Sequence, residues 1–178
     1  PARCSTYTCR ADGYHGGASG ISASVSSILT GEATGDNFGH SVASAGDVNG
    51  DGYADVIVGA DYNDGGESNN VGEAYVYQGS GNGIITTAIW SDQGEAAYNY
   101  FGESVASAGD VNGDGYGDVI VGAHRNDGAG KAYVYHGSAS GLSASPDWSD
   151  QGEAKDDYFG SSVAPAGDVN GDGYADVI

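Results

Sequence analysis

The apolar residues of this chain fall in short runs separated by clusters of Gly, Asn and Asp. One run, Val56-Ile57-Val58, is continuously apolar, which is typical of a strand covered on both faces. The run at 73–78 alternates, so the rings of Tyr75 and Tyr77 share one face, where packing between sheets is their expected role and a ligand platform the alternative. The pattern predicts strands at 41–45, 54–60, 73–78 and 84–90.

The segment 38–60 recurs almost unchanged at 101–123 and again at 159–178. The repeat length is about 60 residues, and a fixed period of this size marks an array of supersecondary units. Each unit carries the same predicted strands, and a four-stranded sheet stacked between like sheets is a propeller blade. We therefore predict an all-β fold built from four-stranded antiparallel β-propeller blades.

The repeat also divides the chain. The predicted parts are an N-terminal segment with the outer strands of a split blade at 1–31, repeats at 32–94 and 95–152, and a partial repeat at 153–178. Because 14–24 matches 135–145, the two ends interrupt the repeat at almost the same phase. Propellers have about four to eight blades, so we expect about three repeat-equivalents to belong to a larger propeller or assembly. Missing sequence, or strand addition by a second copy, would complete the split blade.

Charge and composition narrow the class of protein. Lys and Arg total 5 against 25 Asp and Glu, which gives a formal net charge of −20. Such a surface repels phosphate, so we expect no nucleic acid partner. No run approaches the roughly 18 apolar residues of a membrane span, so we expect no membrane insertion. With 39% hydrophobic residues, the chain is expected to fold and to recruit cations rather than to be disordered.

The clearest candidates for a binding site are three acidic loops: loop 1 at 47–55, loop 2 at 110–118 and loop 3 at 168–176. Each offers side-chain oxygens at loop positions 1, 3, 5 and 9 and a backbone carbonyl at position 7, as hard calcium ions prefer. We predict about three Ca²⁺ sites. Their ligands are Asp47, Asn49, Asp51, Tyr53 and Asp55 in loop 1, Asp110, Asn112, Asp114, Tyr116 and Asp118 in loop 2, and Asp168, Asn170, Asp172, Tyr174 and Asp176 in loop 3.

Other interpretations of these loops remain open. An EF-hand would need an acidic residue at position 12, where Val58 and Val121 stand in apolar runs. Asn and Asp also form metal-free turns, so a plain hairpin is one alternative. A catalytic metal is another, although a ligand set this rich in protein oxygens leaves little room for an open position.

The pair Phe38-Gly39 and the later Val58-Gly59-Ala60 bracket the acidic loop 1, and this arrangement resembles the FG-GAP repeat of integrin alpha-chain propellers and bacterial relatives. All three units carry the Phe-Gly pair and the loop. The resemblance implies a propeller whose blades bind calcium between their first and second strands. One departure is that the family's proline after Gly-Ala is Asp61 in the first repeat and His124 in the second.

The sequence predicts no catalytic site. His15, His40, His124 and His136 are scattered, and no Gly-x-Ser-x-Gly elbow occurs. Trp90 and Trp148 precede an expected turn, where carbohydrate stacking is a minor alternative. Cys4 and Cys9 would lie about 16 Å apart in an extended strand, beyond the roughly 7 Å limit of a disulfide. They would therefore bond only if the segment turns, and otherwise join another chain or stay free.

We therefore expect a non-enzymatic, calcium-binding module of a secreted or cell-surface protein, used for adhesion or recognition of a protein or glycan. One alternative is a structural subunit that self-associates through the split blade and Cys4 or Cys9 into a ring or filament. Another is an accessory propeller of a larger secreted hydrolase. The copies differ most at 61–71 and 124–130, where we expect binding. An extracellular location is expected because it supplies calcium and permits disulfides.

Overall fold

The computed structural model describes residues 8–64 and 69–178. Two four-stranded antiparallel sheets, blade 1 and blade 2, form its centre, and their strands lie side by side in chain order. Blade 1 consists of β5 (Ser41–Gly46), β6 (Asp55–Ala60), β7 (Glu73–Tyr77) and β8 (Ala88–Gln93). Blade 2 consists of β9 (Ser104–Gly109), β10 (Asp118–Ala123), β11 (Lys131–Tyr135) and β12 (Trp148–Gln151). The all-β prediction of propeller blades is confirmed.

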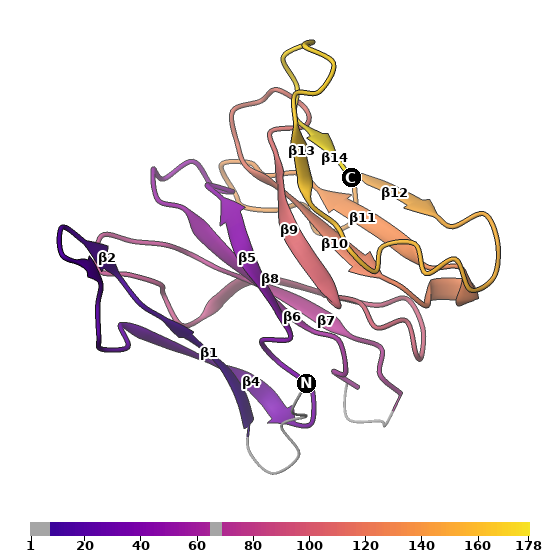
Figure 1. Cartoon of the computed structure of the whole chain (residues 1–178), viewed down its shortest axis with the longest axis horizontal. Coiled ribbons are helices and arrows are strands. Elements are labelled where there is room, and N and C mark those ends of the chain that lie inside the picture. The colour runs from indigo at the N-terminus through magenta and orange to yellow at the C-terminus, as the bar shows by residue number, and fades with distance from the viewer. Residues whose placement is uncertain (1–7, 65–68) are drawn as a thin grey trace.

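Two smaller sheets flank the blades at opposite ends of the molecule (Figure 1). One pairs β1 (Thr8–Gly13) with β4 (Ser27–Thr34), and the other pairs β13 (Pro165–Gly167) with β14 (Asp176–Val177). By repeat position, the first pair holds the third and fourth strands of a blade and the second pair holds the first and second strands. β4 extends past residue 31, where the sequence analysis placed a boundary.

Two minor elements complete the described chain. A short hairpin pairs β2 (Gly16–Gly17) with β3 (Gly20–Ile21) between β1 and β4, and one 3-10 turn, η1 (Asn126–Gly128), precedes β11. No helix in residues 8–64 and 69–178 is long and apolar enough to cross a membrane.

The core lies between neighbouring sheets. Ile57, Val76, Val119 and Tyr133 are buried in one cluster that joins blade 1 to blade 2. A second cluster joins blade 1 to the β1–β4 sheet, and there the ring of Phe38 lies 5.7 Å from Tyr75 and 6.2 Å from Tyr77. The predicted packing role of these tyrosines is thereby confirmed. Each fully buried large apolar side chain contributes about 1.5–3 kcal/mol, so the contacts between sheets hold the array together.

The Phe-Gly and Gly-Ala pairs meet where one sheet touches the next. The N–H of Gly39 donates to the carbonyl of Gly59 at 3.0 Å, and the N–H of Gly102 donates to Gly122 at 3.0 Å. A Cβ on Gly59 would collide with the carbonyl oxygen of Gly102 in the next blade. Glycine is therefore required at this position because two backbones approach each other directly.

The fourth strand of blade 1 differs from the prediction. It was expected at 84–90, but β8 spans Ala88–Gln93, and Trp90 pairs with Val76. Ile84 instead packs against the cluster between blade 1 and the β1–β4 sheet. The apolar pair Ile84-Ile85 was mistaken for a strand because packing in a connection and burial in a strand leave the same pattern. Trp90 itself contacts Tyr135 edge to face, with 4.8 Å between the ring centroids, and donates to the carbonyl of Ser143 at 2.9 Å, which is a structural role.

Candidate metal centres

Each acidic loop connects the first two strands of its sheet, as predicted: loop 1 joins β5 to β6, loop 2 joins β9 to β10, and loop 3 joins β13 to β14. In loop 1 the carboxylate of Asp47 closes the turn. Three backbone N–H groups donate to it, those of Gly50, Asp51 and Gly52 at 2.7–3.1 Å. These are charge-assisted hydrogen bonds, which are stronger than neutral ones. The loop conformation is therefore encoded within the loop itself.

Loops 2 and 3 repeat this cage of hydrogen bonds. Asp110 accepts from Gly113, Asp114 and Gly115 at 2.7–3.0 Å. Asp168 accepts from Gly171, Asp172 and Gly173 at 2.7–3.0 Å. The turn also needs left-handed backbone, since Gly50 has φ of 74° and Gly52 has φ of 89°, which favours glycine. The three loops thus share one local structure.

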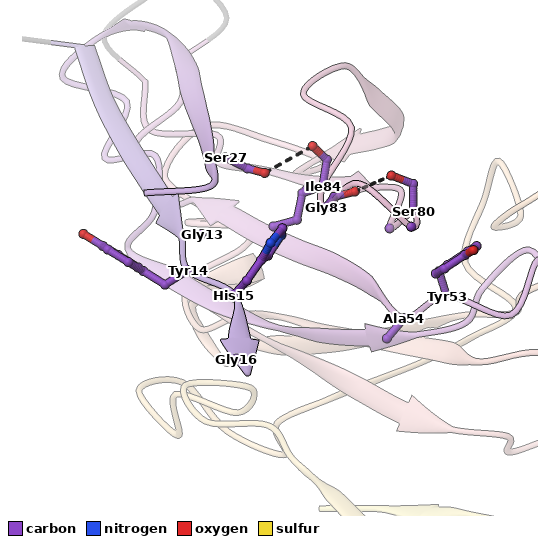
Figure 2. Close-up of a pocket in the computed structure, with 12 residues that line it drawn as sticks. Gly13, Tyr14, His15, Gly16, Ser27, Tyr53, Ala54, Ser80, Gly83 and Ile84 are labelled. Atoms are coloured by element: carbon purple, nitrogen blue, oxygen red, sulfur yellow. Dashed lines mark hydrogen bonds between the residues drawn. The ribbon is translucent and has the colours of Figure 1, made fainter. Parts of the chain in front are cut away.

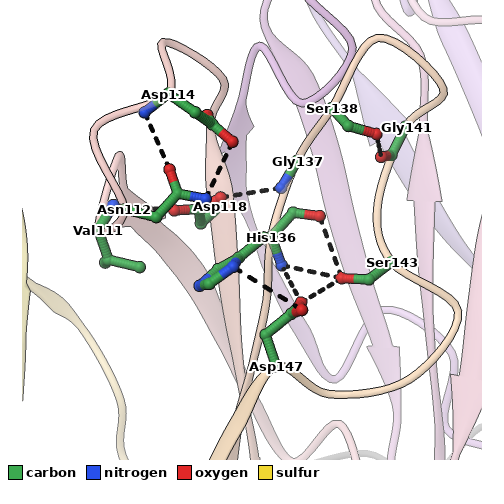
Figure 3. A network of polar contacts seen from close by, with 10 residues as sticks. All are labelled: Val111, Asn112, Asp114, Asp118, His136, Gly137, Ser138, Gly141, Ser143 and Asp147. Atoms are coloured by element: carbon green, nitrogen blue, oxygen red, sulfur yellow. Dashed lines mark hydrogen bonds and ion pairs between the residues drawn. The ribbon is translucent and has the colours of Figure 1, made fainter.

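The aspartate at position 9 ties each loop to its sheet. In loop 1, Asp55 is buried, and its two oxygens accept hydrogen bonds from Val48 at 3.0 Å and Gly79 at 2.9 Å. Asp118 of loop 2 makes the equivalent pair of bonds, and Figure 3 shows it beside Asn112 and Asp114. Burial raises the pKa of both Asp55 and Asp118 above the usual range for aspartate, and nearby loop carboxylates raise it further.

Within residues 8–64 and 69–178, no Lys, Arg or His side chain forms an ion pair with a carboxylate of the three loops. Among the described residues, the ion pairs join other groups, such as Arg10 with Asp12 and Lys131 with Glu95. A carboxylate oxygen that accepts one N–H still has room for a second partner. The predicted metal-binding atoms of each loop are all oxygens, and this set of ligands suits a hard divalent cation.

The oxygens are not gathered around one point, however. In the part of the chain that the structure describes, no group of three His, Cys, Asp or Glu side chains is arranged to hold a metal ion. Asp51 instead accepts a hydrogen bond from Gln78, and both oxygens of Asp55 face backbone N–H groups. The structure therefore places the predicted ligands of each set in one loop, and their coordination of calcium stays a prediction.

A cavity of about 390 Å³ lies between blade 1 and blade 2, away from the acidic loops. Its lining residues come from connections within and between the sheets: Asn37, His40, Asp61, Tyr62, Tyr100, Glu103, His124 and Arg125. Parts of both regions in which the sequence analysis expected binding therefore line one cavity. Residues 65–68 of the first region lie outside the described residues.

Two histidine–carboxylate pairs face each other in this inter-blade cavity. His40 Nδ1 lies 3.6 Å from Asp61 Oδ1, and His124 pairs with Glu103. Burial raises the pKa of Asp61, while the hydrogen bond from Asn37 and the His40 ring oppose the shift. The sequence analysis treated these histidines as scattered. Comparison of the repeats could have found them, because His40 and Glu103 occupy equivalent positions, as do Asp61 and His124.

Two tyrosines near His124 have an unfavourable backbone conformation: Tyr100 lines the same cavity, and Tyr158 lines a neighbouring one together with Arg125. Tyr100 has φ of 56° and Tyr158 has φ of 55°, in the left-handed region that costs a non-glycine residue roughly 1–2 kcal/mol. Their rings flank His124 at 5.1 and 5.8 Å, and the Arg125 guanidinium lies over them at 5.7 and 5.8 Å. Strain of this kind is concentrated at functional sites, so the inter-blade cavity is a candidate recognition site.

A second cavity, of about 560 Å³, lies between blade 1 and the end of the β1–β4 sheet that is nearest to β2 (Figure 2). His15, Ser27, Tyr53 and Ile84 line it together with several glycines. Two of its hydroxyl groups are bound within the cavity wall, since Ser27 donates to the carbonyl of Ile84 and Ser80 to that of Gly83. Tyr53, the position-7 residue of loop 1, thus turns its ring toward this cavity.

Cys9 is buried and disulfide-bonded, and the described residues contain no free cysteine. The expectation for Cys4 lies outside the described residues. Cys9 packs with Leu29 and Phe38 between the β1–β4 sheet and blade 1.

Comparison with known proteins gives the family. The model for the FG-GAP repeat matches residues 38–77, 101–135 and 159–178. Integrin alpha-7 of Rattus norvegicus is 38% identical over 157 residues, which cover 85% of this chain and 13% of the relative. Integrin alpha-6 of Gallus gallus is 37% identical over 160 residues, covering 86% and 14%. Integrin alpha-5 of Xenopus laevis is 34% identical over 160 residues, covering 84% and 15%.

The chain therefore spans about one seventh of the length of the integrin alpha chains it matches. The matched segments contain the Phe-Gly pairs, the acidic loops and the inner strands, which are the features that built the two blades. The chain belongs to the FG-GAP repeat family.

Proposed function

We propose that this chain is a non-enzymatic, calcium-binding module of an extracellular or cell-surface protein, used for adhesion or recognition. The observation that carries the proposal is the threefold repetition of an oxygen-rich loop that forms no ion pair with any described cationic side chain, in a sequence similar to integrin alpha chains. Family membership alone favours a non-enzyme. The disulfide of Cys9 supports an extracellular location.

The residues that would hold calcium are the predicted five of each loop. The aspartates at positions 1, 5 and 9 supply charge, the asparagine at position 3 supplies a neutral oxygen, and the tyrosine at position 7 supplies its backbone carbonyl. Bound calcium would offset the repulsion between carboxylates that the fold brings together in one turn. Glycines with left-handed backbone allow the tight turn that places these residues in one loop.

The recognition surface of this proposal is the inter-blade cavity. The ring of Tyr100, the cation of Arg125 and the two histidine–carboxylate pairs offer stacking and hydrogen bonding to a protein or glycan. The proposal predicts that binding to a coated extracellular-matrix extract or a glycan array falls in Tyr100→Ala and Arg125→Ala. Trp148→Ala, which changes an exposed aromatic outside this cavity, is the matched control.

Calcium titration tests the metal part directly. The chain, stripped with EGTA, is titrated with calcium chloride in a calorimeter and melted with and without the ion. Heat of binding and a rise in melting temperature are expected, because an ion that binds only the folded state stabilises it. Millimolar calcium that gives neither result overturns the proposal.

A second candidate is a subunit that assembles by strand addition. It is favoured by the complementary strand positions of the β1–β4 and β13–β14 sheets, and by the exposed apolar side chain of Val169, which follows β13. The test is light scattering of the chain in calcium. Assemblies that dissociate when Val177→Pro removes a backbone donor of β14 would support it, and a monodisperse monomer would exclude it.

A further inference from the structure

We propose that the acidic loops of successive sheets bind calcium cooperatively, because one peptide group connects each loop to the loop before it. The inference rests on the proposed calcium function and deepens it. The connecting group is the peptide between positions 7 and 8: Tyr116–Gly117 in loop 2 and Tyr174–Ala175 in loop 3.

The two ends of this peptide face different loops. The N–H of Gly117 donates to the backbone carbonyl of Asp47, the first residue of loop 1, at 2.8 Å. The carbonyl of the same peptide, on Tyr116, is the predicted position-7 ligand of loop 2. A trans peptide directs its carbonyl and its N–H to opposite sides. Calcium held by that carbonyl would also polarise the N–H of Gly117, and the hydrogen bond from Gly117 to loop 1 would become stronger.

The side chain at position 7 makes a second connection. The ring of Tyr116 covers Gly50 of loop 1 so closely that a Cβ there would lie 2.6 Å from the ring carbon Cε1. Gly50 is one of the donors that hold the Asp47 carboxylate. Tyr116 is therefore a positioning residue for loop 1, although it belongs to loop 2.

The same two contacts recur one sheet further along the chain. The N–H of Ala175 donates to the carbonyl of Asp110 at 3.0 Å, and the ring of Tyr174 covers Gly113 at the same 2.6 Å. Blade 2 adds a further bond to loop 1, from the N–H of Ser138 to the carbonyl of Val48 at 3.1 Å. The arrangement is thus a repeated device that passes the order of one loop to its neighbour.

Calcium bound to loop 2 would restrict the motion of the Tyr116–Gly117 peptide and of the Tyr116 ring, which both support loop 1. Linkage then requires the reverse, so occupation of loop 1 raises the affinity of loop 2. Couplings of this kind typically amount to about 5–150-fold in affinity. Loops 1 and 3 do not share such a peptide, so their coupling is expected to be much weaker.

The experiment follows calcium binding loop by loop in the chain 1–178, using the NMR amide signals of Gly52, Gly115 and Gly173 as reporters. Asp114→Ala disables loop 2 and is expected to lower the calcium affinity of loop 1 at least about 5-fold. Asp172→Ala disables loop 3 by the matched change and should leave the affinity of loop 1 within about 2-fold. Equal affinities of loop 1 in the two variants overturn the inference and leave the calcium function intact.

A second pair of variants covers the case in which Asp114→Ala does not fold. Tyr116→Ala removes the ring but keeps the backbone carbonyl, and it should weaken calcium binding at loop 1, whereas Tyr116→Phe should restore it. If both variants bind at loop 1 like the unmodified chain, ring support is excluded. A chain in which calcium moves none of the three reporters overturns the calcium function and this inference together.

Discussion

Loop 1 and loop 3 have nearly the same sequence and the same internal hydrogen bonds, yet they differ in burial. Val48 of loop 1 is 0% exposed, whereas its equivalent in loop 3, Val169, is 72% exposed. The hydrogen bonds to Asp47 and the equivalent bonds to Asp168 agree in length to within about 0.2 Å. The conformation of the turn is therefore determined by residues within the loop, whereas the next sheet along the chain buries it.

Removal of calcium is expected to change the stability most, because it acts on all three predicted calcium sites at once. A ligand at 100 times its dissociation constant stabilises the folded state by about 2.7 kcal/mol per site. Chelation by EGTA should therefore lower the melting temperature strongly, as followed by circular dichroism. Magnesium at the same concentration is the control, because it prefers a stricter octahedral geometry and keeps its waters. Identical melting curves in calcium and EGTA would contradict the prediction.

Substitution of alanine at two equivalent glycines, Gly50 of loop 1 and Gly171 of loop 3, distinguishes the cost of backbone strain from the cost of contact with the neighbouring sheet. Gly50 and Gly171 have φ of 74° and 76°, so alanine pays a similar backbone cost of roughly 1–2 kcal/mol at both. At Gly50 the new Cβ also meets the ring of Tyr116, whereas at Gly171 it would meet no described atom within 4 Å. Overpacking adds about 1–3 kcal/mol, so Gly50→Ala should be clearly the more destabilising in urea unfolding.

A Gly50→Ala chain that is as stable as Gly171→Ala would show that the ring of Tyr116 moves aside freely. The double variant Gly50→Ala with Tyr116→Ala is the control. It should recover the part of the loss that comes from contact with the ring and none of the part that comes from the backbone.

The valine at position 2 tests burial without changing the backbone. Val48→Ala removes two buried methyl groups, and we expect a loss of about 2 kcal/mol in the free energy of unfolding. Val169→Ala should lie within about 0.5 kcal/mol of the unmodified chain because the side chain is exposed. Val111, which is partly buried, should fall between them. Equal losses at Val48 and Val169 would mean that the loops are buried alike in solution.

The features that repeat within one unit of the chain could be predicted from the sequence. The inner strands β5 to β7 and the positions of the acidic loops follow from periodicity and turn chemistry inside one unit, and the Phe-Gly pair was identified by resemblance to the FG-GAP repeat. Prediction from the sequence failed where contacts between units decide. The fourth strand was predicted too early in the chain because Ile84 is apolar and packs against another sheet, and the inter-blade cavity was missed because its lining residues come from two blades that pack side by side. The support that Tyr116 gives to Gly50 was invisible for the same reason.

The smallest expected effect compares the two blades away from their loops. Glu73 at the start of β7 is partly buried, and burial raises its pKa, whereas its equivalent, Lys131, forms an ion pair with Glu95 at 2.8 Å. A carboxyl whose pKa is raised in the folded state keeps its contribution to stability below the unfolded pKa of about 4.3 and loses it as pH rises through the folded value. Glu73→Gln should therefore match the unmodified chain near pH 4 and become the more stable of the two toward pH 7, as measured by urea unfolding at both pH values. Lys131→Gln is the control at the equivalent position, and it should not gain stability over the same range. A Glu73→Gln chain whose relative stability is independent of pH would mean that the carboxyl of Glu73 is fully hydrated in the folded protein.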